Sequence, residues 1–162
     1  MKQNELLKRN KKRILGIDLA SYDTGWSVMT NELNYGLIHF PKSRPVEQRL
    51  LLLYNGLQEI IDTYQPEVMV LEDQFLGRNV KTLKTLSWVR GVVMLLAAQN
   101  EIPIVVITPT EIKQITTGKG NAGKEDIRKT VSLIFGIKEH LNDNVSDAIA
   151  IALSYILKGD QP

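Results

Sequence analysis

Three acidic residues stand where a charge would be costly to bury. Asp18 ends the apolar run "RILGID", and Glu72 ends a second run, "EVMVLE". Asp147 lies in "NVSDAIAIAL", just before small and apolar residues. Desolvating an unpaired carboxylate is unfavourable, so each needs a partner. A turn explains Asp18 alone and a helix start explains Asp147 alone, but the three together suggest one shared acidic site.

The residue types point to a magnesium or manganese site. The chain has no cysteine and only two histidines, His39 and His140, which argues against zinc. Asn144 and Asp143 precede Asp147 by three and four residues, so either could share its helix face. Hard oxygen ligands favour Mg²⁺ or Mn²⁺. One or two such ions could activate a water and stabilise the leaving oxygen of a phosphodiester.

The elements that would position these residues follow from the hydrophobic pattern. We predict strands at 13–19, 24–30 and 34–40, forming an antiparallel meander, and buried parallel strands at 67–73 and 102–108. We predict helices at 45–64, 79–99, 124–135 and 145–158, and a glycine loop at 118–123. The segment "TPTEIKQIT", 108–116, indicates a further short helix that begins at Thr108 or Thr110. The predicted fold class is α/β, a mixed five-stranded sheet with helices on both faces. Neighbouring strands would then bring Asp18 and Glu72 to one edge, where sites form.

Size and charge bound the organisation of the chain. The 162 residues carry a net charge of +2, but residues 1–13 contain six basic residues and one acidic residue. We predict a flexible basic arm at 1–12, which suits either polyanion binding or solubility, and one domain at 13–159. The longest apolar run, Val92–Ala98, is too short to span a bilayer. We therefore expect no membrane partner and a cytoplasmic location, which the lack of cysteine also fits.

Five segments together resemble a known family. They are "ILGIDLASYDTGW", "VLEDQF", "VRGVV", "EIKQITTGKGNAGKEDI" and "NVSDAIAIAL", which span most of residues 13–157. Their order and spacing resemble the RuvC-type Holliday-junction resolvases of the ribonuclease-H-like superfamily. The resemblance implies a homodimer that makes paired symmetric nicks in a four-way DNA junction during recombination and repair. Each metal-dependent cut would leave a 5′-phosphate.

The resemblance also assigns roles to individual residues. It implies an acidic metal site at Asp18, Glu72 and Asp147 helped by Asn144, phosphate-neutralising residues at Lys113 and Lys124, and an aromatic against junction bases at Phe75. The helix at 79–99 matches the family's dimer interface. The pattern of basic residues adds Arg78, Lys81, Lys119 and Arg128 as further candidates for DNA contact. One departure stands out: the family usually has Asp or His where this chain has Asn144, which offers a carbonyl oxygen but no charge.

Other functions fit part of the same pattern. Asn144 leaves open a module that binds branched DNA and cuts it weakly or not at all. A YqgF-type nuclease of ribosomal RNA processing shares the opening motif. The segment "GKGNAGKE", 118–125, nearly spells a phosphate-binding loop, but Glu125 replaces the required hydroxyl. The opening motif also resembles actin-like ATPases, which need two lobes that this length does not hold.

Overall fold

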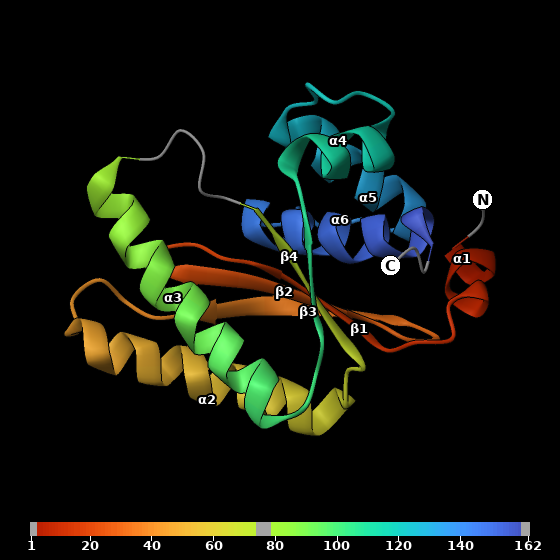
Figure 1. Ribbon diagram of the computed structural model, residues 1–162. Coiled ribbons are helices and arrows are strands. Elements are labelled where there is room, and N and C mark those ends of the chain that lie inside the picture. The colour runs from red at the N-terminus through yellow and green to blue at the C-terminus, as the bar shows by residue number, and fades with distance from the viewer. Residues whose placement is uncertain (1–2, 74–78, 160–162) are drawn as a thin grey trace.

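The computed structural model describes residues 3–73 and 79–159, and its centre is one mixed five-stranded sheet (Figure 1). The strands are β1 (Ile14–Asp18), β2 (Asp23–Met29), β3 (Leu33–His39), β4 (Val68–Glu72) and β5 (Ile104–Ile107). Their order is β3-β2-β1-β4-β5, with β1 antiparallel to β2 and parallel to β4. The predicted meander and the two following parallel strands are therefore confirmed.

Helices cover both faces of the sheet, as predicted. They are α1 (Gln3–Arg9), α2 (Val46–Tyr64), α3 (Val80–Gln99), α4 (Pro109–Thr117), α5 (Lys124–Phe135) and α6 (Asp143–Lys158). Helices α2 and α3 pack on one face, whereas α1, α4, α5 and α6 lie on the other (Figure 1). Within residues 3–73 and 79–159, no helix has both the length and the apolar character needed to cross a membrane.

Side-chain caps fix where α4 and α6 begin. Thr108 accepts a hydrogen bond from the Glu111 backbone N–H (3.3 Å), and Glu111 accepts one from the Thr108 backbone N–H (3.1 Å). This reciprocal pair is a capping box. Asn142 caps α6 by accepting from the Asn144 N–H (2.9 Å). Helix α6 therefore begins two residues earlier than predicted, which places Asp143 and Asn144 in its first turn.

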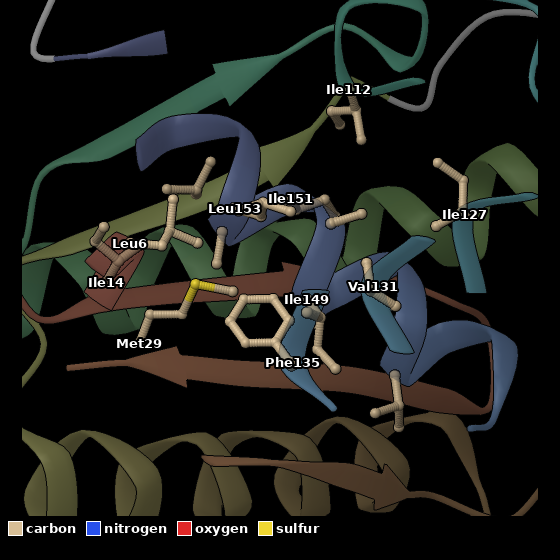
Figure 2. Packing of buried hydrophobic residues seen from close by; sticks show 14 of the residues in the cluster. Leu6, Ile14, Met29, Ile112, Ile127, Val131, Phe135, Ile149, Ile151 and Leu153 are labelled. Atoms are coloured by element: carbon tan, nitrogen blue, oxygen red, sulfur yellow. The ribbon is translucent and has the colours of Figure 1, made fainter. Parts of the chain in front are cut away.

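The N-terminal segment differs from the flexible arm that we expected. Residues Gln3–Arg9 form α1, and its Leu6 and Leu7 are 4% and 1% exposed. Figure 2 shows Leu6 beside Ile14 of β1, in the core under α6. The many basic residues of this segment led us to expect a flexible arm, although it also contains Leu6 and Leu7. The burial of these two leucine side chains holds the helix on the domain.

Strand β5 is less buried than its sequence suggests. We expected a fully buried strand from the continuous apolar run, but only Ile107 is buried, and Val106 is 43% exposed. The strand lies at the edge of the sheet beside β4, and the described helices cover it only in part. An apolar run alone does not distinguish a central strand from an edge strand, so this part of the prediction was wrong.

Helix α6 lies unusually close to the sheet because two glycines sit beneath it. A Cβ atom at Gly25 in β2 would lie 1.9 Å from the backbone oxygen of Asn144, and one at Gly16 in β1 would lie 2.5 Å from that of Ala148. The buried Ser27 hydroxyl donates to the same Ala148 oxygen (2.9 Å). Any side chain at either glycine would push the helix away from the strands that it packs on.

We predict that Gly25→Ala destabilises the protein by at least about 3 kcal/mol, because its methyl group would overlap backbone that cannot move aside. Gly56→Ala in α2 is the matched control, since the atoms nearest to that methyl would be those of the Ile38 side chain, at 3.1 Å. The gain in helix propensity should keep Gly56→Ala within about 1 kcal/mol of wild type. Denaturant unfolding of both variants measures the difference, and equal midpoints would contradict the prediction.

Candidate active site

Three carboxylates from distant parts of the sequence meet where the neighbouring strands β1 and β4 end. Ile17 pairs with Leu71 in the parallel β1–β4 ladder, so Asp18 and Glu72 end neighbouring strands. The alternation along both strands directs these two residues toward the α6 face, opposite Ile17 and Leu71, which pack under α2 and α3. Asp147, in the second turn of α6, comes to the same strand ends because α6 lies over β1 and β2.

These residues line one pocket of about 710 Å³. Its walls include Asp18, Glu72, Asn144 and Asp147, together with the basic residues Lys113 and Lys124. The structure therefore brings together all six residues that we predicted for the catalytic centre. Asp18 is 6% exposed, which is low for a carboxylate.

The environment of Asp147 disfavours its negative charge. Burial, the largest cause, and the nearby charges of Glu72 and Asp143 together raise its pKa from the ordinary 3.8 to about 6, although Lys124 and Lys113 oppose the shift. A proton or a cation near Asp147 would relieve this cost. The site therefore has the electrostatic character of a cation-binding pocket.

The donor set suits a hard divalent cation. The pocket is lined by four carboxylates, those of Asp18, Glu72, Asp73 and Asp147, and by the amide group of Asn144. None of its lining residues in the described part of the chain is a histidine. Across the described residues, 3–73 and 79–159, no three His, Cys, Asp or Glu side chains lie close enough to form a metal site as they stand. An ion would have to draw the carboxylates of Asp18, Glu72 and Asp147 closer together.

The two pocket lysines come from α4 and α5. Lys113 lies one turn after the capping box that begins α4, and Lys124 is the first residue of α5. Lys124 Nζ lies 3.9 Å from a carboxylate oxygen of Asp143. Both lysines lower the pKa of Asp147, so their charges are felt at the acidic centre. They are therefore placed to meet a phosphate that enters the pocket.

The remaining basic candidates are more varied. Arg128 forms ion pairs with Glu125 and, at 2.8 Å, with Asp143, so acidic neighbours already balance its charge. Lys119 and Lys81 are exposed and lie outside the pocket lining. The predicted contacts at Phe75 and Arg78 lie outside the described residues.

The glycine loop at 118–123 is not a phosphate-binding loop of nucleotide hydrolases. Such loops connect a strand to a helix, whereas this loop connects α4 to α5. Gly118 ends α4 with a positive φ of 78°, and the Gly123 N–H donates to Asp126 (3.0 Å) at the start of α5. The loop sets the angle between two helices that each carry one pocket lysine.

Sequence reasoning missed several residues of the pocket. Ser21, Tyr22, Asp73 and Thr82 also line it. The first three follow β1 or β4 within four residues, and the loops after parallel strands are the usual place for binding residues. Proximity to a strand end is therefore the sequence signal that these three residues share with Asp18 and Glu72.

Comparison with known proteins gives a consistent family. The family model for crossover junction endodeoxyribonuclease RuvC matches residues 14–155. The protein of that name from Caldicellulosiruptor saccharolyticus is 38% identical over 153 residues, covering 90% of this chain and 92% of the relative. The one from Chloroflexus aggregans is 37% identical over 150 residues, covering 88% and 92%.

Solved structures agree with the sequence matches. The T. thermophilus RuvC in complex with Holliday junction substrate superimposes with a TM-score of 0.80 at 25% identity, covering 88% of this chain and 92% of that one. The yeast mitochondrial Holliday junction resolvase Ydc2 superimposes with a TM-score of 0.61 at 12% identity, covering 96% and 85%. The second match supports the fold alone.

We predict that Asp147→Asn stabilises the metal-free protein at pH 8. The folded-state pKa of about 6 lies above the ordinary 3.8, so the folded protein binds the extra proton between these values and loses stability as the pH rises through 6. Removing the charge at residue 147 should raise the free energy of unfolding by up to about 3 kcal/mol.

Thermal unfolding in chelator at pH 8 and pH 4 measures this effect. The increase in melting temperature of Asp147→Asn over wild type should be largest at pH 8. It should be smaller at pH 4, where the wild-type carboxyl is protonated. A variant less stable than wild type at pH 8 would contradict the electrostatic account.

Proposed function

Because the chain belongs to the RuvC family of crossover junction endodeoxyribonucleases, we propose that it cuts four-way DNA junctions in the pocket between β1, β4 and α6. One observation carries this proposal: Asp18, Glu72 and Asp147 line a single pocket that Lys113 and Lys124 also line. Acidic residues can bind metal cations, and the neighbouring basic residues can bind a phosphodiester, so the pocket could hold both together. The ribonuclease-H-like fold brings these residues together from widely separated segments.

The proposed cofactor is magnesium or manganese, with one or two ions in each site. Asp18, Glu72 and Asp147 would hold it, with the Asn144 amide oxygen as a neutral ligand. When bound, such ions activate a water and stabilise the leaving oxygen of a phosphodiester. The donor chemistry and the raised pKa of Asp147 support this assignment.

The protein's own residues position the DNA strand and balance its charge. Lys113 and Lys124 bind the phosphate at which the cut occurs and stabilise the negative charge that develops there. The buried Asp18 fixes the base of the pocket, because β1 is central in the sheet. The products are a 5′-phosphate and a 3′-hydroxyl.

We also propose that the active form is a homodimer built on α3. This helix exposes an apolar stripe in which Trp88, Met94 and Leu95 are 39%, 54% and 54% exposed. Exposed apolar surface of this kind is typical of interaction sites. Two-fold symmetry would place two pockets on opposed strands of a junction, as paired symmetric nicks require.

The first test compares a labelled synthetic four-way junction with a linear duplex of the same sequence. Wild-type protein with magnesium or manganese should make symmetric nicks in the junction alone, and chelator should prevent them. Asp18→Asn should lower cleavage at least about 100-fold, because several kcal/mol of transition-state stabilisation depend on the ion site, while junction binding persists. Asp62→Asn, an exposed aspartate on α2, is the matched control and should cut normally.

The neutral side chain of Asn144 supports a second candidate function, the binding of branched DNA without efficient cleavage. Tight junction binding without nicks in either metal would favour a branched-DNA-binding module, with the missing charge at Asn144 as the cause. Near wild-type cutting by Asp18→Asn would instead show that the site assignment is wrong.

We predict that Asn144→Asp lowers the magnesium concentration for half-maximal cleavage by about tenfold, because it adds a charged ligand worth at least about 1.4 kcal/mol of attraction. Asn144→Ala, which removes the neutral ligand, should shift the requirement in the opposite direction. Magnesium titrations of cleavage rate measure both changes. An unchanged or raised requirement in Asn144→Asp would count against Asn144 as a ligand.

A further inference from the structure

We propose that Tyr22, Lys42 and Arg49, here called the Tyr22 corner, form a binding site for a backbone phosphate of the DNA beside the active pocket. The corner lies at the junction of the β1–β2 loop, the loop after β3 and the start of α2. Its two cations, Lys42 and Arg49, are outside the lining of the acidic pocket, whereas Tyr22 belongs to that lining. The inference rests on the proposed function, since it names a contact with the same substrate.

The geometry of the corner gathers two cations around one aromatic ring. The Lys42 ammonium lies 5.5 Å from the centroid of the Tyr22 ring, and the Arg49 guanidinium carbon lies 5.2 Å from it. Arg49 Nη1 also donates to the backbone oxygen of Ser21 (3.3 Å). Attraction to the ring and this hydrogen bond hold both charges in place without an acidic partner.

The charge of the corner is unbalanced. Neither Lys42 nor Arg49 has a carboxylate within 4.0 Å in the part of the chain that the structure describes. The Nε atom of Arg49 is buried, and among the described residues it has no hydrogen-bond acceptor. A guanidinium carries five N–H donors, and only one of those on Arg49 donates to another described residue, at the Ser21 carbonyl. The geometry of the other donors matches the oxygens of a phosphate. Arg128, in contrast, already pairs with two carboxylates.

The position of the corner relative to the pocket supports a DNA ligand. Tyr22 and Ser21 line the same pocket as Asp18, so the corner begins where the pocket wall ends. Lys113 and Lys124 enter from α4 and α5, whereas Arg49 comes from α2, which packs on the other face of the sheet. A strand whose scissile phosphate lies in the pocket would therefore meet positive charge on both sides.

A phosphate is favoured over other ligands by the chemistry of the corner. Two fixed cations select an anion, and planar guanidinium donors match the oxygens of a phosphate. A base seeking an aromatic platform would have to displace the cations that already lie against Tyr22. The substrate of the proposed reaction is a polyanion, and Tyr22 lines the pocket that it would enter.

The test measures how junction affinity depends on salt. Binding of a labelled four-way junction is followed by fluorescence anisotropy in chelator, between about 50 and 200 mM salt. Each lost phosphate contact should reduce the slope of log K against log salt by about 0.9, which corresponds to about eightfold weaker binding near 0.1 M. We expect this for Lys42→Gln and for Arg49→Gln, whereas Arg49→Lys should keep most of the slope.

The matched control is Lys138→Gln, which removes one exposed charge outside the pocket lining and should leave the slope unchanged. Unfolding curves establish that each variant is folded. If Arg49→Gln does not fold, the salt dependence of Lys42→Gln alone tests the phosphate site.

The outcomes separate this inference from the proposed function. If wild type neither binds nor nicks the junction, the proposed function fails and the corner falls with it. If wild type binds and nicks, but Lys42→Gln and a folded Arg49→Gln keep the wild-type slope and affinity, only the phosphate site is overturned. A loss of slope in Lys138→Gln as large as that in Lys42→Gln would also overturn it, since the effect would then be one of net charge.

Discussion

The close contact between α6 and the sheet is the constraint on which the rest of the structure depends. Gly16 and Gly25 leave room for the helix backbone, and the Ser27 hydroxyl satisfies the Ala148 carbonyl at the point of contact. Close packing of this kind tolerates little change in volume. Because the helix sits so low, Asp147 reaches the ends of β1 and β4, where Asp18 and Glu72 lie.

The charges around the pocket are arranged in layers. Asp18, Glu72 and Asp147 form an acidic centre that is partly or fully buried. Lys113, Lys124 and the Tyr22 corner place positive charge around it from both sides of the sheet. The negative centre alone would repel DNA, and a purely basic surface would hold DNA without cutting it. The combination suits a protein that must attract a polyanion and then concentrate cations at one phosphate.

Much of this arrangement could be predicted from residue patterns. Apolar periodicity located the elements closely, and the rule that sites form at strand ends brought Asp18 and Glu72 together. Burial was less predictable, because it depends on neighbours that a linear pattern does not contain. Val106 is exposed only because β5 is an edge strand, and Leu7 is buried only because α1 folds back onto the domain.

The Tyr22 corner could not be predicted from the sequence, because it too depends on neighbours that only the fold brings together. Nothing in the spacing of Tyr22, Lys42 and Arg49 indicates that two loops and a helix bring them together. Asp143 was similar: its spacing indicated that it could share a helix face with Asp147, but not that Arg128 and Lys124 would pair with it. Helical spacing identified the face of α6, whereas the identity of its partners required the fold.

The docking of α6 has a consequence for how activity arises during folding. Asp18 and Glu72 belong to the sheet, but the third carboxylate arrives only when a helix whose residues Ala148–Ser154 are wholly buried has closed over it. A chain with a formed sheet and an undocked α6 exposes its core and has no complete site. Until α6 docks, the pocket lacks Asp147, so closing the hydrophobic core and completing the acidic centre are one structural event.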